Sequence, residues 1–269
     1  MPSQKDIDFV LRTVEERNIR FVRLWFCDVS GNLKSFAISP EDLEEAFGEG
    51  VGFDGSAVDG FAALEESDML AFPEPDTFQV LPWRQSENGA ARMFCSVRTP
   101  DRKSFEGDPR EVLNRVVNSL DAKGYVPFAA PRIEYFYFKD SQDPVLSDQA
   151  SYFDLTPWDS AHDLRRDTTL MLERMSIPVE YSFHAQAPSQ NGIELRYSEA
   201  LGCADNIMTA RLVIKQEAFA NGFFASFMPK PFSDAPGSGM HTHLSLFEGE
   251  ANAFYEAGQE FNMSMTARQ

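Results

Sequence analysis

The stretch ASFMPKPFSDAPGSGMHTHLSLF, residues 225–247, combines three local features around which the rest of the chain is expected to be arranged. Lys230 lies between two prolines, and the run GSG at 237–239 is a flexible turn with exposed backbone N–H groups. His241 and His243, two of the four histidines, then alternate with other residues along a predicted strand. Side chains two positions apart on a strand share a face, about 6.6 Å apart. The pattern indicates a metal or phosphate site, the alternative being two ordinary polar residues on the solvent face of a sheet.

The composition favours a globular protein without membrane or nucleic-acid partners. The chain has 269 residues, 43% of them hydrophobic, enough for one large domain or two smaller ones. A net charge of −18 repels nucleic-acid phosphates and anionic membranes. No apolar run approaches the ~20 residues of a membrane span, and the first residues lack the features of a signal peptide. The three cysteines, Cys27, Cys95 and Cys203, are odd in number and far apart, which predicts a reducing, cytoplasmic location.

The first part of the chain predicts a small domain with a mixed sheet. Strands are expected at 20–29, 33–38 and 91–97, separated by turn residues and glycines. A helix is expected after Ser3, where apolar residues recur at helical spacing, and another begins at Pro40. We expect this domain to span residues 1–105.

Residues 106–269 predict a larger domain. Asp108-Pro109 is typical of a helix start, and further helices are expected after Asp159 and over 204–219. Strands are expected at 129–139, 179–187, 193–197 and 240–246, and the dipeptide Asn191-Gly192 predicts a hairpin turn between two of them. Residues 261–269 look like the start of another helix without a stop signal. The domain is therefore expected to be incomplete at its C-terminus.

Five motifs follow one another along the chain: GFDGSAVDGF at 52–61, PRIEYFYF at 131–138, YFD at 152–154, VEYSFHAQAPSQNGIELRY at 179–197, and FMPKPF with GSGMHTHLSLF at 227–247. Together they resemble type I glutamine synthetases of the bacterial, actinobacterial-like kind. The resemblance implies an α+β fold, with a small β-grasp N-terminal domain and a partial catalytic α/β domain built on a curved antiparallel sheet. It also implies a homo-oligomer of two stacked hexameric rings with each active site between neighbouring subunits.

The activity that the resemblance implies is an ATP-dependent ligation. In that family ATP phosphorylates the γ-carboxylate of glutamate, and ammonia then displaces the phosphate. Two divalent cations, Mg²⁺ or Mn²⁺, offset the charge that develops on the phosphates, and such hard cations are held by glutamates and one histidine. An aspartate accepts a proton from ammonium and so makes the nucleophile. A relative that joins glutamate to another amine fits the same pattern.

The resemblance also assigns roles to individual residues. Asp54 matches the proton-accepting aspartate, for which turn-capping beside Gly55 is the alternative. Glu134 and His241 match metal ligands. The remaining matches are nucleotide contacts at Glu180 and Tyr197, contacts beside the ATP phosphates at His243 and Ser245, and a backbone contact to glutamate at Gly237.

Three positions depart from the pattern. Arg132, Ala185 and Gly192 stand where the family has metal-binding glutamates. Losing three negative charges and gaining a positive one changes the local charge by four units, which weakens cation binding even where solvent screens it. Beyond residue 269 the family continues with arginines that grip glutamate and phosphate, a flap glutamate and one more metal ligand. We therefore expect weak or absent ligase activity from this chain as it stands.

Three classes of function stay open. The first is an ATP-dependent amide ligase, and the second is a catalytically impaired pseudoenzyme or regulatory partner of the same fold. The third takes His241 and His243 as the metal pair of a hydrolase. That third class needs further ligands from other strands, and Glu134 is the one obvious candidate.

Overall fold

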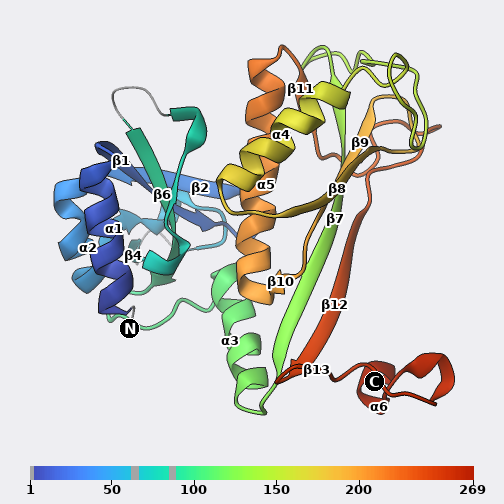
Figure 1. The fold of residues 1–269 in the computed structure, drawn as a ribbon. Helices are drawn as coiled ribbons and strands as arrows, with labels where there is room; N and C mark the ends of the chain where they lie inside the picture. Colours follow the sequence, from blue (N-terminus) through green and yellow to red (C-terminus); the bar gives the residue numbers. More distant parts are fainter. Residues whose placement is uncertain (1–2, 62–66, 85–88) are drawn as a thin grey trace. The chain divides into compact units, whose positions relative to one another are not determined.

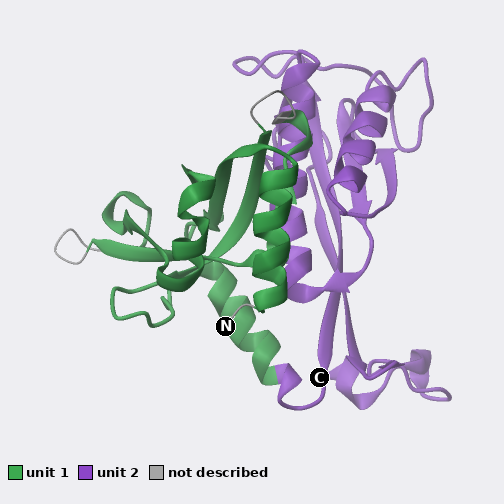
Figure 2. Ribbon diagram, turned by 60° about the vertical axis from the view of Figure 1, so that its left-hand side comes forward, with its two compact units in different colours: residues 1–119 green, residues 120–269 purple. Residues whose placement is uncertain are grey.

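The computed structural model describes residues 3–61, 67–84 and 89–269. The chain divides into two compact units, residues 1–119 and 120–269 (Figure 2). Each unit has its own sheet and is described by itself. Within the described ranges, none of the helices has the length and apolar character needed to cross a membrane. No disulfide bond joins Cys27, Cys95 and Cys203.

The first unit contains a six-stranded mixed sheet with the strand order β2-β1-β6-β4-β3, and β5 pairs with β6 (Figure 1). Strands β1 and β6 run parallel, and the other pairs are antiparallel. The elements are α1 (Gln4–Glu16), β1 (Ile19–Cys27), β2 (Leu33–Ile38), η1 (Pro40–Asp42), α2 (Leu43–Glu49), β3 (Val51–Asp54), η2 (Gly55–Ala57), β4 (Asp68–Pro73), η4 (Pro75–Thr77), β5 (Gln79–Val80), η5 (Pro82–Arg84), β6 (Gly89–Arg98) and α3 (Pro109–Asp121).

Helix α1 forms where the sequence predicts it. The Ser3 side chain accepts the N–H of Asp6, and the apolar stripe of the helix buries Val10 and Val14. These valines join Leu24 and other residues of β1 and β6 in the core of the first unit. The helix therefore covers one face of the mixed sheet.

The second unit contains a seven-stranded antiparallel sheet in the order β13-β12-β7-β9-β8, and β10 and β11 also pair with β7. The long strands β7 and β12 run side by side (Figure 1). The elements are β7 (Val126–Phe138), α4 (His162–Arg174), β8 (Val179–His184), β9 (Gln190–Leu195), β10 (Ser198–Glu199), α5 (Ala200–Ala220), β11 (Phe224–Ser226), β12 (Met240–Glu248), β13 (Ala251–Asn252), η6 (Glu260–Asn262) and α6 (Met265–Arg268).

Helices α4 and α5 cover one face of this second sheet. Helix α5 packs on β7 and β11, and α4 packs on α5 and β8. Tyr137 of β7 hydrogen-bonds Thr168 of α4, so Tyr137 and the buried Ile133 and Tyr135 point toward the helices. Because side chains alternate along a strand, Arg132 and Glu134 point to the opposite face. The polar residues of β7 therefore lie on the side of the sheet away from the helices.

The prediction of a hairpin turn at Asn191-Gly192 is wrong. Both residues lie within β9, and the chain turns before them, where Ser189 adopts a positive φ of 63°. Asn191 is buried, donates to the carbonyl oxygen of Ser189 and accepts from the Arg165 guanidinium. These tertiary hydrogen bonds hold Asn191 in the strand and override its local preference for a turn.

Candidate functional site

A cavity of about 620 Å³ opens on the face of the second sheet that the helices leave uncovered. Four of the predicted site residues line it together: Glu134, Gly237, His241 and His243. The other lining residues are Arg132, Tyr152, Gln186, Gln190, Pro236 and Gly239.

Strand register explains why these side chains meet. The pairing of β7 with β12 places His241 opposite Arg132 and His243 opposite Ala130. Directly opposite residues share a face, and Glu134 lies two positions beyond Arg132 on that face. The alternation of the histidines along β12 therefore directs both of them to the cavity, as the sequence predicts.

Glu134 is held by contacts on both of its carboxylate oxygens. Its Oε2 accepts the N–H of Gly239 at 2.9 Å and lies 3.4 Å from Nε2 of Gln190. Its Oε1 lies 3.6 Å from the Arg132 guanidinium. A Cβ on residue 239 would fall 2.6 Å from Nε2 of His241 and 3.3 Å from Oε2 of Glu134. A side chain at 239 would therefore require the imidazole of His241 to move.

Gln190 was not predicted from the sequence, and it connects two of the predicted residues. Its side-chain amide donates to the carbonyl oxygen of Gly237 at 2.8 Å as well as reaching Glu134, and its Oε1 accepts the N–H of Ala187. The side chain is buried, with 1% of its surface exposed. Gln190 lies inside the motif at 179–197, but a neutral amide carries no charge or metal-ligand signal that would single it out.

Arg132 occupies the cavity wall where the resemblance places a glutamate. Its Cζ lies 4.2 Å from the centre of the Phe183 ring, and its Nη2 lies 3.5 Å from the hydroxyl of Tyr152. Across the sheet, β9 places Glu194 directly opposite Arg132. A hydrogen bond with Glu194 raises the pKa of Tyr181 on the neighbouring strand. The guanidinium therefore lies among the Glu134 carboxylate and the rings of Tyr152 and Phe183.

The other predicted residues lie outside this cavity. Asp54 belongs to the first unit, where its carboxylate caps η2 by accepting the N–H and the hydroxyl of Ser56, and these bonds lower its pKa. Glu180 is exposed and pairs with Arg196 at 3.0 Å. Tyr197 is 52% exposed. Ser245 lies on β12 two residues beyond His243 and is half-buried.

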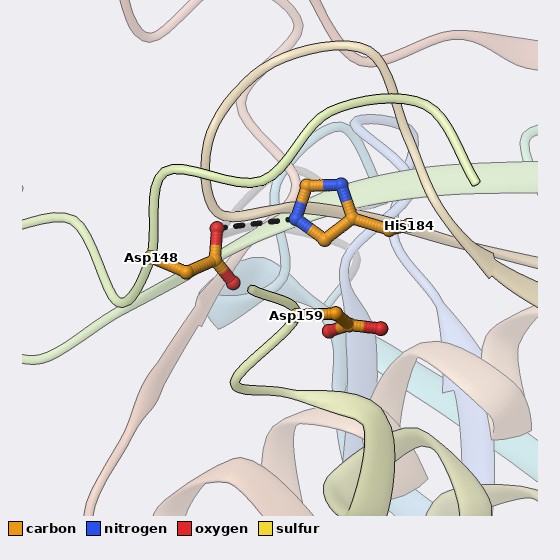
Figure 3. Close-up of side chains that lie close together, drawn as sticks. All are labelled: Asp148, Asp159 and His184. Carbon is orange, nitrogen blue, oxygen red and sulfur yellow. Dashed lines mark hydrogen bonds and ion pairs between the residues drawn. The ribbon is translucent and has the colours of Figure 1, made fainter. Parts of the chain in front are cut away.

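A second polar cluster, also unpredicted, lies beneath the turn between β8 and β9. Asp148, Asp159 and His184 offer ligand atoms within 4.8 Å of one another (Figure 3). Both ring nitrogens of His184 are engaged, Nε2 with Asp148 at 3.1 Å and Nδ1 with the Ala185 carbonyl oxygen at 2.9 Å. Asp159 forms an ion pair with the buried Arg165. Since these ligand atoms already have partners, the cluster stabilises the turn rather than offering an open metal site.

Burial alone lowers the pKa of His184, but its hydrogen bonds to Asp148 and Ala185 outweigh burial and raise the pKa above the ordinary value. For Asp148, burial raises the pKa, while the bonds from His184 and from the N–H of Ser189 reverse this and lower it. The two groups therefore favour an ion pair of imidazolium and carboxylate.

Comparisons with known proteins agree with this architecture. Residues 18–100 match the family model described as the glutamine synthetase β-grasp domain, and residues 106–269 match the glutamine synthetase catalytic domain. The curated protein "Glutamine synthetase" of Mycobacterium tuberculosis is 52% identical over 98% of this chain and 60% of its own length. The protein of the same name from Thermotoga maritima is 44% identical over 97% of this chain and 61% of its own length.

Solved structures show the same fold. The structure named "Apo GmaS without ligand" has a TM-score of 0.88 at 26% identity and is matched over 96% of this chain and 61% of its own. The Plasmodium falciparum glutamine synthetase, at 18% identity and a TM-score of 0.89, supports the fold alone. The expected α+β fold, a β-grasp domain followed by a catalytic domain with a curved sheet, is confirmed. The chain spans about 60% of the length of these curated relatives.

Proposed function

This chain belongs to the glutamine synthetase family, and we propose that it serves an ATP-dependent ligation of ammonia, or of another amine, to the γ-carboxylate of glutamate through γ-glutamyl phosphate. The observation that carries this proposal is the convergence of Glu134, Gly237, His241 and His243 on one cavity. The proposed substrates are glutamate, ammonia and ATP.

Each predicted residue has a proposed role in this reaction. Asp54 accepts a proton from ammonium, which requires an ionised carboxylate, and the hydrogen bonds from Ser56 that lower its pKa make it a weaker base than an ordinary aspartate. Gly237 contacts glutamate through its backbone. The proposed nucleotide contacts are Glu180 and Tyr197, with His243 and Ser245 beside the phosphates.

The family's divalent cation, Mg²⁺ or Mn²⁺, does not fit the side chains present here. Glu134 and His241 are the two proposed metal ligands, but both oxygens of Glu134 already have partners and one of them faces a guanidinium. Ala185 and Gly192 supply no ligand atom from a side chain. These side chains do not assemble the family's metal site, and we propose that turnover by this chain is weak or absent.

The second candidate is a non-catalytic protein of the same fold, a regulatory or assembly partner. It is favoured by Arg132, which brings a positive charge into the cavity within 3.6 Å of the carboxylate of Glu134. Either candidate is proposed to act in the cytoplasm as a homo-oligomer of two stacked hexameric rings. The proposed domains are residues 1–105 and 106–269, whereas the compact units divide at residue 119 within α3.

Phosphate release distinguishes the two candidates. The purified chain is incubated with ATP and Mg²⁺, with and without glutamate, and with ammonium or a larger amine. Release that requires both glutamate and an amine, and that disappears in Glu134→Gln, supports the ligase. A chain that binds ATP or glutamate by calorimetry but releases no phosphate with any amine supports the non-catalytic partner.

A further inference from the structure

The cavity of the second unit contains a permanent cation of its own. The Arg132 side chain is 22% exposed and lies against Glu134, the Tyr152 hydroxyl and the face of the Phe183 ring. A guanidinium keeps its charge at every pH at which a protein is folded, so this cation cannot be removed by titration. Any ion that enters the cavity meets it.

The carboxylates of Glu134 and Glu194, which lie near Arg132 in the sheet, already have ion-pair or hydrogen-bond partners. Glu134 is the one carboxylate among the described residues that line the cavity, and Arg132, Gly239 and Gln190 contact its two oxygens. Glu194 lies opposite Arg132 in the sheet and hydrogen-bonds Tyr181. A divalent cation would have to displace these partners and accept repulsion from the guanidinium at close range.

The Phe183 ring contacts Arg132 and also limits the space at position 192. It forms a cation–π contact with Arg132, and it also fills the space beside residue 192, where a Cβ would fall 2.1 Å from its Cζ. Position 192 therefore has no room for a ligand side chain, and the guanidinium has a flat surface to rest on. Both effects depend on the same ring.

We infer that Arg132 is a tethered cation that takes the place of a divalent metal ion in this cavity, that Phe183 holds it there, and that the cavity does not bind Mg²⁺ or Mn²⁺. The inference concerns the cavity of the proposed function but does not rest on ligase activity. Its test measures metal binding without nucleotide, so that either proposal can fail without the other.

The test is a Mn²⁺ titration of the whole chain followed by electron paramagnetic resonance. Wild type and Glu134→Gln should bind Mn²⁺ equally weakly, through surface carboxylates alone. Arg132→Glu should bind one Mn²⁺ at least tenfold more tightly, since the new carboxylate lies opposite His241 and on the face of Glu134. Arg20→Glu, which makes the same charge change at an exposed position of the first unit, should gain no such site. A stoichiometric Mn²⁺ site in wild type that Glu134→Gln abolishes would overturn the inference, as would equal affinities of the two glutamate variants.

A pair of milder variants covers the case in which Arg132→Glu does not fold. Arg132→Gln removes the charge and keeps a polar side chain, whereas Arg132→Lys keeps the charge. The glutamine variant should bind Mn²⁺ severalfold more tightly than the lysine variant, with thermal unfolding used to verify that both are folded. Equal Mn²⁺ affinity of the two would show that the charge of residue 132 does not exclude the metal.

Discussion

The ring of Phe183 lies so close to the backbone of Gly192 that a Cβ on residue 192 would fall 2.1 Å from the ring's Cζ atom and 2.4 Å from Cε1. The two residues are paired in the register of β8 and β9. Phe183 is buried, with 4% of its surface exposed, so its ring has little freedom to move aside. Glycine at position 192 is therefore required by space and not by an unusual backbone conformation.

We expect Gly192→Ala to destabilise the chain by about 1–3 kcal/mol, because the added methyl group overpacks a buried site. The free energy of unfolding is measured by urea denaturation. Combined with Phe183→Ala, the same substitution should cost much less, because the two residues are in contact and their effects are not additive. Gly202→Ala in α5 is the matched control: nothing lies within 4 Å of its added Cβ, and helix propensity predicts a small gain in stability. Additive costs of Gly192→Ala and Phe183→Ala would contradict the packing argument.

Gln190→Ala should lower the free energy of unfolding by about 1–3 kcal/mol, because the substitution leaves the half-buried carbonyl oxygen of Gly237 and the buried N–H of Ala187 without their hydrogen-bond partner. The variant should also lose order in the segment that carries Gly237, measured as faster amide hydrogen exchange at residues 237–239. Gln186 lines the same cavity, and Gln186→Ala serves as the control. Equal exchange rates in both variants would mean that Gln190 does not position this segment.

The His184–Asp148 pair predicts how stability depends on pH. The folded-state pKa of His184 is raised above 6.5, so its stabilising contribution is fully present below about pH 6.5 and is lost as the pH rises through the folded-state pKa. The pKa of Asp148 is lowered below 3.8, so its contribution is present above that value and is lost as the pH falls further. The difference in unfolding free energy between wild type and Asp148→Asn should therefore shrink as the pH rises above neutrality.

Denaturation at a series of pH values from about 5 to 9 measures this difference. His162→Gln changes an exposed histidine at the start of α4 and should leave the pH dependence as in wild type. If the difference in unfolding free energy between wild type and Asp148→Asn instead grew as the pH rose above neutrality, the result would show that His184 is neutral in the folded chain.

The strands of the cavity were predictable because their pattern is local. Strand β12 carries alternating residues after a glycine turn, and the spacing of His241 and His243 alone determines that they share a face. The motif at 131–138, which contains Glu134, predicted strand β7 in the same way. What the sequence could not give is the partner of each strand, since a register such as His241 opposite Arg132 is fixed by packing across the whole sheet.

The turn between β8 and β9 shows where local reasoning fails. Asn191-Gly192 has strong turn propensity, yet Arg165 of α4 binds the side chain of Asn191, and the ring of Phe183 fills the space beside Gly192. Both partners are distant from the dipeptide along the chain or belong to another strand. The sequence also revealed that Arg132 reverses a charge, but not that Phe183 supports the guanidinium.

The last prediction concerns turnover. We expect the unmodified chain to release little phosphate from ATP in the presence of Mg²⁺, glutamate and ammonium. Carboxylates introduced by Arg132→Glu, Ala185→Glu and Gly192→Glu should not raise the rate while Phe183 is present, because its ring occupies the space that a side chain at 192 needs. Adding Phe183→Ala frees that space for the carboxylate introduced at position 192.

The four-position variant should therefore exceed the three-position variant at least tenfold in glutamate-dependent phosphate release, provided that both bind Mn²⁺ and unfold cooperatively. The physical reason is that transfer of a phosphoryl group to a carboxylate brings two anions together, and a bound cation lowers the cost of their approach. Arg132 supplies one positive charge, but it forms hydrogen bonds to oxygen and does not coordinate it as a divalent ion does. A turnover rate of the unmodified chain equal to that of the four-position variant would show that the guanidinium is sufficient for the reaction and that the carboxylates are dispensable.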